Sequence, residues 1–165
     1  MILTIYTFIH VVISLAGILS GGVVLSGLLA AKRLDGWTAL FLATTVLTSL
    51  TGFFFPRHHI MPSHIVGIIS LAVQAVAVYA YYSKRLAGGW RLAYVISAML
   101  AFYLNVFVAI VQAFMKIPAL KALAPTQTEP PFKLTQLTVL VLFTILTIVA
   151  TIRFRNEPVR PPGLA

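Results

Sequence analysis

The stretch Ile2–Ala31, ILTIYTFIHVVISLAGILSGGVVLSGLLAA, contains no Lys, Arg, Asp or Glu. An α-helix crosses the hydrocarbon core of a bilayer in about 20 residues, so this run is long enough to span it. The run is too long for the apolar region of a secretory signal, and no basic residue precedes it. We therefore expect a retained transmembrane helix that ends before Lys32 and Arg33.

Four further apolar runs follow the first, and polar or proline-containing segments separate them. The five runs are Ile2–Ala31, Trp37–Phe55, Ser63–Tyr82, Trp90–Phe114 and Leu134–Ile152. Hydrophobic residues make up 60% of the 165 residues and charged residues only 9%, well below the roughly 25% of a soluble domain. The sequence therefore predicts an all-α, polytopic transmembrane helical bundle of five helices over residues 1–152, with a short cytoplasmic tail over 153–165.

Lys and Arg are divided unequally between the two ends of this predicted bundle. Eight fall at one end, namely Lys32, Arg33, Lys84, Arg85, Arg91, Arg153, Arg155 and Arg160, and four at the other, namely Arg57, Lys116, Lys121 and Lys133. Basic loops are retained in the cytoplasm, so the sequence predicts an N-terminus outside and a C-terminus inside. The cytoplasmic interface then holds the amphipathic rings expected there, those of Trp37, Tyr81, Tyr82, Trp90 and Tyr94.

Several function classes are disfavoured by what the sequence lacks. It has no cysteine, which removes disulfides, iron–sulfur clusters and thiolate metal sites. Its basic residues are scattered among short loops, unlike the single basic face of a protein that binds nucleic acid. The three acids, Asp35, Glu129 and Glu157, lie outside the apolar runs, so no intramembrane carboxylate is present for a proton- or cation-coupled transporter.

Small and weakly polar residues recur at helical spacing in three of the runs. The stripes are His10, Ser14, Gly17 and Gly21; Thr44, Thr48 and Thr51; and Ser63, Gly67, Ser70 and Gln74. Small residues on one face let transmembrane helices approach closely, so helix packing is the first interpretation of these stripes. On the fourth run Asn105 and Gln112 face one way, and we expect them to hydrogen-bond to Gln74 or to a bound ligand.

All four histidines are predicted to lie at the end of the bundle that faces away from the cytoplasm. His58 and His59 are in the loop after the second run, and His64 begins the third. At 1.5 Å per residue, His10 and His64 lie about 31 Å and 27 Å from the cytoplasmic ends of their helices, hence at a similar depth. Imidazole is the commonest metal ligand, so a shared site is one hypothesis, and a solvated loop is the other.

The histidines permit two kinds of site, which compete for His64. A haem b would be held between histidines of two helices, with a basic side chain towards its propionates. Its predicted contacts are His10, His64, Arg57, Asn105 and Gln112. A bare transition-metal ion, copper rather than a hard cation, would be held by imidazole nitrogens and a thioether. Its predicted ligands are His10, His58, His59 and His64, with Met61 beside them.

Several segments of the chain resemble an uncharacterised family of small polytopic bacterial inner-membrane proteins. The segments are Thr51–Pro56, Pro62–Gly67, Tyr103–Phe107 and Ala124–Phe132. This resemblance covers most of the chain, and it implies a bacterial inner membrane and a periplasmic histidine face, but no activity. The proline-rich segment Ala124–Phe132 is expected to be non-helical and to lie across the outer mouth of the bundle as a lid or a partner surface.

Three functions are compatible with these features. The leading hypothesis is a membrane protein whose periplasmic histidine site binds haem or a transition metal and exchanges electrons with quinone. The second is a non-enzymatic accessory or assembly subunit, whose stripes and proline-rich loop bind another membrane protein. The third, a small-molecule transporter, is disfavoured because the spans carry no charge.

Overall fold

A computed structural model describes residues 2–55 and 62–155, except for the side chains of residue 2 and residues 62–64. The elements in chain order are α1 (Ile2–Leu29), α2 (Asp35–Phe53), α3 (Pro62–Val78), the π-helix η1 (Tyr79–Ser83), α4 (Trp90–Lys116), α5 (Pro118–Leu123) and α6 (Pro130–Phe154). Within the described residues, five helices are long and apolar enough to cross a membrane. The prediction of an all-α, multi-pass membrane protein is therefore confirmed.

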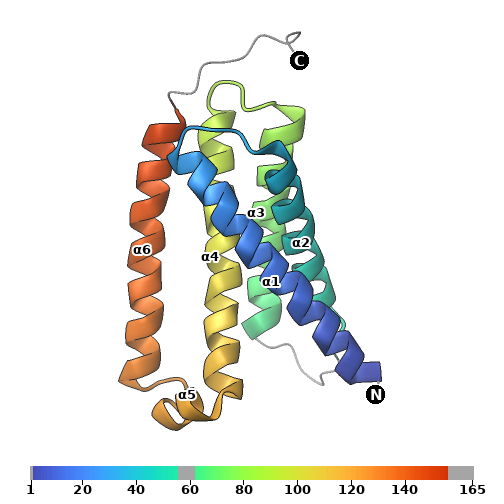
Figure 1. Ribbon diagram of the computed structural model, residues 1–165, viewed down its shortest axis with the longest axis vertical. Helices are drawn as coiled ribbons and strands as arrows, with labels where there is room; N and C mark the ends of the chain where they lie inside the picture. The colour runs from blue at the N-terminus through green and yellow to red at the C-terminus, as the bar shows by residue number, and fades with distance from the viewer. Residues whose placement is uncertain (1, 56–61, 156–165) are drawn as a thin grey trace.

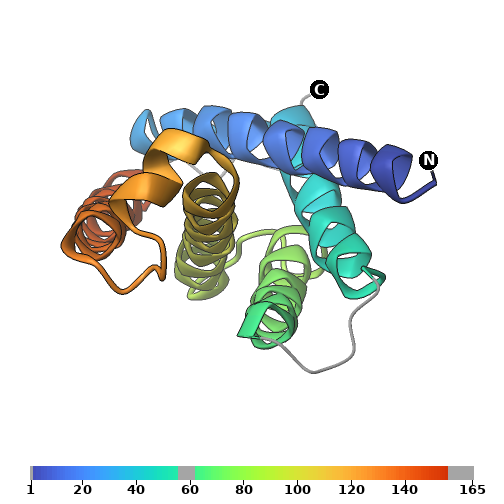
Figure 2. The same ribbon diagram turned by 90° about the horizontal axis from the view of Figure 1, so that it is seen from below.

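Four of the five long helices stand in a curved row, in the order α2, α3, α4 and α6, and α1 crosses one side of that row (Figures 1 and 2). Each helix in the row packs on its neighbour, and α1 packs on α2, α4 and α6. The two ends of the bundle differ in charge. We call the end at Leu29 and Phe154 the basic end, and the end at His10 and Phe53 the histidine end.

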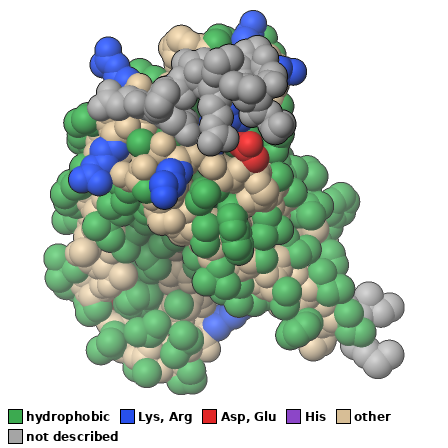
Figure 3. All heavy atoms as spheres, turned by 45° about the horizontal axis from the view of Figure 1, so that its top comes forward, with side chains coloured by type: hydrophobic (Ala, Val, Ile, Leu, Met, Phe, Trp, Pro, Cys, Tyr) green, Lys and Arg blue, Asp and Glu red, His purple; other side chains and the backbone are tan. Residues whose placement is uncertain are grey.

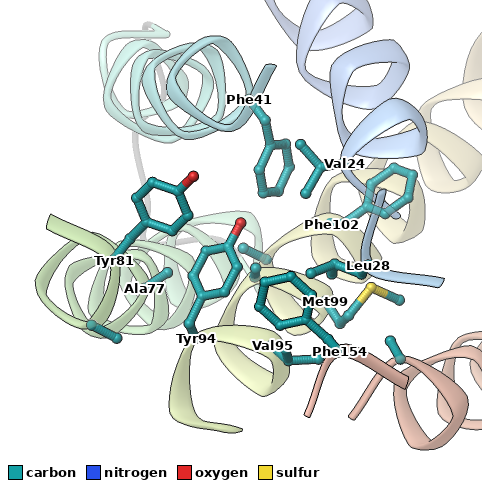
Figure 4. Close-up of a cluster of buried hydrophobic side chains, with 14 of the residues drawn as sticks. Val24, Leu28, Phe41, Ala77, Tyr81, Tyr94, Val95, Met99, Phe102 and Phe154 are labelled. Atoms are coloured by element: carbon teal, nitrogen blue, oxygen red, sulfur yellow. The ribbon is translucent and has the colours of Figure 1, made fainter. Parts of the chain in front are cut away.

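The densest packing lies in the half of the bundle nearer the basic end. Its fully buried large side chains include Phe41 of α2, Tyr94 of α4 and Phe154 of α6, and Val24 and Leu28 of α1 close over them (Figure 4). Towards the histidine end α1 diverges from α4 and α6 (Figure 1). Residues 103–113 of α4 are accordingly only partly buried on every face.

The start of α6 corrects one expectation from the sequence. The segment Ala124–Phe132 was expected to be non-helical throughout, but α6 begins at Pro130, so its last three residues form the first helical turn. Proline is tolerated there because the first turn of a helix has no internal acceptor for its N–H groups, and the fixed φ of proline suits a helix. The remaining part, Ala124–Glu129, is a loop that follows the short helix α5.

The aromatic residues expected at the basic interface divide into two groups. Trp37, Tyr82 and Trp90 are exposed, as expected for rings at a membrane interface. Tyr81 and Tyr94 are instead buried, 4% and 1% exposed, so their rings pack between the helices and do not face the membrane surface. Tyr81 belongs to η1, and its hydroxyl points with that of Tyr94 into the space between the helices (Figure 4).

Candidate functional site

His10 is held in the contact between α1 and the last turns of α2. Its Nδ1 lies 2.7 Å from the Oγ1 of Thr51, and its ring packs edge-on against Phe55, with the ring centroids 5.1 Å apart. One turn earlier on α1, the Tyr6 hydroxyl donates to the carbonyl of Thr51, and the Tyr6 ring packs on the same phenylalanine. The predicted stripe on α1 therefore begins in a contact face, and the side chains of Thr51 and Phe55 fix the position of the His10 ring.

The hydrogen bonds of Thr51 favour a proton on the Nδ1 of His10. The Thr51 hydroxyl has a single hydrogen, and it donates this hydrogen to the Leu47 carbonyl at 2.6 Å. Towards His10 the same oxygen must then accept, so the Nδ1 of His10 is the donor. A neutral imidazole protonated on Nδ1 carries its lone pair on Nε2, and this is the arrangement in which a hydrogen-bonded histidine serves as a metal ligand.

The partners predicted for His10 lie where the structure gives no side-chain description. Arg57, His58 and His59 fall outside the described residues, and His64 lies in the first turn of α3 with its side chain outside the description. Among the described side chains, no group of three or more His, Asp or Glu residues is placed to hold a metal ion. The predicted haem pair and the predicted histidine cluster thus stay predictions.

The backbone nevertheless restricts how α1 and α3 can share a ligand. The two helices pack on different sides of α2, as the view along the bundle shows (Figure 2). At the histidine end Phe55 packs on His10 of α1, whereas the ring of Phe53 lies against Gly67 of α3, 3.0 Å from where a Cβ on that glycine would stand. The end of α2 and its aromatic side chains therefore lie between the two helices that carry the predicted haem ligands.

Asn105 is placed deeper in the bundle and has a different partner from the one expected. Its Nδ2 donates to the Oγ1 of Thr45 at 3.1 Å, and no Asn105–Gln74 hydrogen bond is formed, so the expected pairing with Gln74 was wrong. Gly17 lies beside this bond, because a Cβ there would stand 3.3 Å from both Asn105 Nδ2 and Thr45 Oγ1. Gln112 is half-buried, and no described side chain or backbone group hydrogen-bonds to its amide.

Gln74 forms a second polar cluster between α2 and α3. Its Nε2 donates to the hydroxyl oxygens of Ser70 at 2.7 Å and Ser49 at 3.2 Å, although the side chain is only 1% exposed. Its Oε1 has no hydrogen-bond partner within the described structure. The stripe on α3 therefore faces α2, and the cluster acts as interhelical hydrogen bonding within the apolar bundle.

A third polar cluster closes the basic end and was not predicted from the sequence. Tyr81 donates to the Asp35 carboxylate, which also pairs with the Arg33 guanidinium at 3.2 Å, and this guanidinium stacks over the Tyr81 ring. Burial alone would lower the pKa of Arg33, but its hydrogen bonds to Tyr81 and Asp35 raise it, so it stays charged. The position of Asp35 in the first helical turn of α2, where an acid complements the helix dipole, was the available signal.

All five spanning helices contribute to a cleft beside this cluster. Its lining includes Leu28 of α1, Thr38 of α2, Tyr81 of η1, Tyr94 of α4 and Phe154 of α6. Its volume is about 10 Å³, which is room for a single water molecule. The cleft therefore has no space for an organic cofactor, and the cluster is better explained as the closure of the basic end than as a binding site.

Comparison of the chain with protein-family models, with curated proteins and with solved structures finds no match. The resemblance to a family of inner-membrane proteins is therefore not extended to a named family. What the fold establishes is a small polytopic integral membrane protein in contact with the lipid bilayer.

Proposed function

We propose that the histidine end is a transition-metal site in which the Nε2 of His10 is one ligand and the imidazoles of His58 and His59 supply others. The observation that carries this proposal is the hydrogen bond from His10 Nδ1 to Thr51, since it leaves the lone pair of the ring on Nε2. An imidazole and thioether donor set suits copper. Electron exchange with a membrane quinone is the function that such an ion would serve.

A bare ion is favoured over a haem for a geometric reason. A haem between His10 and His64 needs the two helices to face each other across the macrocycle. The end of α2 separates α1 from α3, and Phe53 and Phe55 fill the space on its two sides. A metal ion held by His10, His58 and His59 requires no such displacement, because the two loop histidines follow Phe55 closely in the chain and Phe55 already packs on His10.

The cellular setting belongs to the same proposal. The basic asymmetry of the loops supports a cytoplasmic basic end and a histidine end on the periplasmic side of a bacterial inner membrane. In this orientation the metal ion would enter the site from the periplasm, and the quinone would reach it from the bilayer. Orientation is tested with reporters fused after Ala165 and within α5, which should report opposite compartments.

Metal titration of matched threonine variants tests the assignment of His10. Thr51→Val removes the acceptor of the His10 bond, and we expect it to weaken copper binding about 10- to 100-fold, the usual effect of losing a ligand's hydrogen-bond partner. Thr44→Val is the control, because the Thr44 hydroxyl makes the same kind of bond to a backbone carbonyl, 2.7 Å from that of Leu40, and does not contact His10. Equal affinities of the two variants would contradict the proposal.

The visible spectrum and the metal content of the purified protein distinguish the bare ion from a haem and from the accessory-subunit function. A Soret band that shifts on reduction would replace the bare ion by a haem. If neither haem nor metal is bound, the accessory-subunit function becomes the better account. The observation that favours this second function is the course of α1, whose first half diverges from α4 and α6 and leaves Leu3, Phe8 and Leu15 exposed.

A further inference from the structure

The loop that joins η1 to α4 carries a lysine between two aromatic rings. The rings of Tyr79 and Trp90 meet edge to face with centroids 5.1 Å apart, and the Lys84 ammonium lies 5.4 Å from the first centroid and 5.7 Å from the second. Both rings are substantially exposed, Tyr79 at 45% and Trp90 at 37%. The ammonium is therefore held at the surface by cation–π contacts, beside rings of the kind that lie at headgroup depth.

The backbone of this loop is fixed rather than loosely tethered. The N–H groups of Lys84 and Leu86 donate to the carbonyls of Tyr79 and Ala80, which closes the end of η1. Leu86 is 2% exposed and anchors the loop in the core. Its backbone φ is +61°, a value that residues other than glycine rarely adopt. Arg85 lies between these two residues, has a φ of +48° and is exposed.

The surroundings of the loop are strongly basic. Among the described residues, the basic end carries Lys32, Arg33, Lys84, Arg85, Arg91, Arg153 and Arg155. The acid described at this end is Asp35, which already bonds to Arg33 and Tyr81. In Figure 3 most of the blue side chains in view gather at the basic end, above a broad apolar surface.

Part of this charge has a structural role, and part does not. Arg153 donates to the Leu29 carbonyl at 3.2 Å, and Arg91 donates to the carbonyls of Phe154 and Arg155, so these two side chains cap the carboxyl ends of α1 and α6. Lys84 and Arg85 make no such bond to a helix end. Both residues are exposed at the basic end, where we expect the phosphates of the bilayer.

We propose that Lys84, Arg85, Tyr79 and Trp90 form a binding site for the headgroup of an anionic phospholipid in the leaflet that the basic end faces. The ammonium and the guanidinium pair with the phosphate, and the two rings pack along the glycerol and the first carbons of the acyl chains. Charge complementarity selects an anionic lipid over a zwitterionic one. The rings distinguish a lipid from free phosphate, which has no apolar part.

Native mass spectrometry of the detergent-purified protein, titrated with phosphatidylglycerol or phosphatidylcholine, tests this site. Each basic residue near an anionic surface contributes about a five-fold change in affinity. Lys84→Gln with Arg85→Gln should therefore weaken phosphatidylglycerol binding at least five-fold and leave phosphatidylcholine unchanged. The control is Lys116→Gln with Lys121→Gln, which removes the charges of two exposed residues at the histidine end.

A third variant separates a specific site from general attraction to basic residues. Trp90→Leu keeps every charge, and we expect it also to weaken phosphatidylglycerol binding. The proposal is overturned if the two double variants lose equal affinity for phosphatidylglycerol, or if the parent binds phosphatidylglycerol and phosphatidylcholine equally. It is also overturned if Trp90→Leu binds phosphatidylglycerol as the parent does and inorganic phosphate competes with that lipid. The last result would indicate a free-phosphate site. Size-exclusion profiles and helix content establish that each variant is folded.

Discussion

Gly21 and Gly22 are adjacent in α1, and their substitution by alanine should change the stability of the protein in opposite directions. A Cβ on Gly21 would stand 2.7 Å and 2.9 Å from Cδ2 and Cε2 of Phe102, about 1 Å inside normal carbon contact. Phe102 has little freedom to move, because it is 7% exposed and packs edge to face against Phe41 and Phe143. A Cβ on Gly22 would meet nothing within 4 Å.

The expected difference in the free energy of unfolding between the two variants follows from two contributions. Replacing glycine by alanine in a helix stabilises it by about 0.4–1 kcal/mol, and this term is common to both positions. Overpacking a buried contact costs about 1–3 kcal/mol, and this term applies only to Gly21. Gly21→Ala should therefore be less stable than Gly22→Ala by about 1–3 kcal/mol.

Equilibrium unfolding in mixed detergent micelles, followed by circular dichroism, measures this difference. The double variant of Gly21→Ala with Phe102→Leu should recover part of the loss, because the smaller side chain relieves the contact. Equal stability of the two alanine variants would refute the packing of α1 on α4 described above.

Three further predictions concern the polar clusters. Asn105→Ala removes the hydrogen bond to Thr45 and should lower the free energy of unfolding by about 0.6 kcal/mol, the average for such bonds between membrane helices; no change would mean that the bond does not hold α4 to α2. Tyr81→Phe removes a hydrogen bond to the Asp35 carboxylate and should lower it by about 1.5–3 kcal/mol in the same assay, so a loss no larger than that of Asn105→Ala would contradict the cluster. Partial desolvation would raise the pKa of Glu129, but the Thr126 hydroxyl and nearby backbone N–H groups donate to it and hold its pKa below 4.5. Because the pKa is lowered, the carboxylate stabilises the loop at pH values above its ordinary pKa, and this stabilisation is lost as the pH falls through the lowered pKa. The loop amides should therefore exchange hydrogen faster in Glu129→Gln than in the parent at pH 7. Equal exchange rates would refute the role of the carboxylate.

The five spans could be predicted from the sequence because the length of an apolar run and the residues that interrupt it are local properties. The stripe of Gly17 and Gly21 could also be assigned to a contact face, since helical periodicity fixes which residues share a face. The partner of Asn105 could not be predicted, because periodicity does not determine which neighbouring helix lies on that face. Its bond to Thr45 depends on the crossing of α1, α2 and α4.

Two local features were missed for different physical reasons. Pro130 was taken to exclude a helix, but a proline in the first turn favours one. Tyr81 was placed at the membrane interface from its position near the end of an apolar run, and the π-helix η1 turns it into the bundle. A single inserted residue in a helix leaves no clear signal in hydropathy, so the hydrogen bond from Tyr81 to Asp35 was not foreseen.

Only part of the candidate site could be predicted from the sequence. The position of His10 near the end of its helix followed from its place in the first apolar run, and the gathering of the other histidines around it stays a prediction. The proton position on His10 could not be predicted, because it depends on the second hydrogen bond of Thr51, which becomes visible only when α1 and α2 are placed together.

Binding of a metal ion through the Nε2 of His10 is tested by the metal content of the purified protein. Protein isolated from copper-supplemented cells should contain about one copper ion per chain, and His10→Ala should contain little or none, because an ion site loses affinity and geometry with one ligand. The comparison requires equal yield and equal size-exclusion profiles of the two proteins. Equal copper content in the parent and in His10→Ala, or no metal in the parent, would contradict the account.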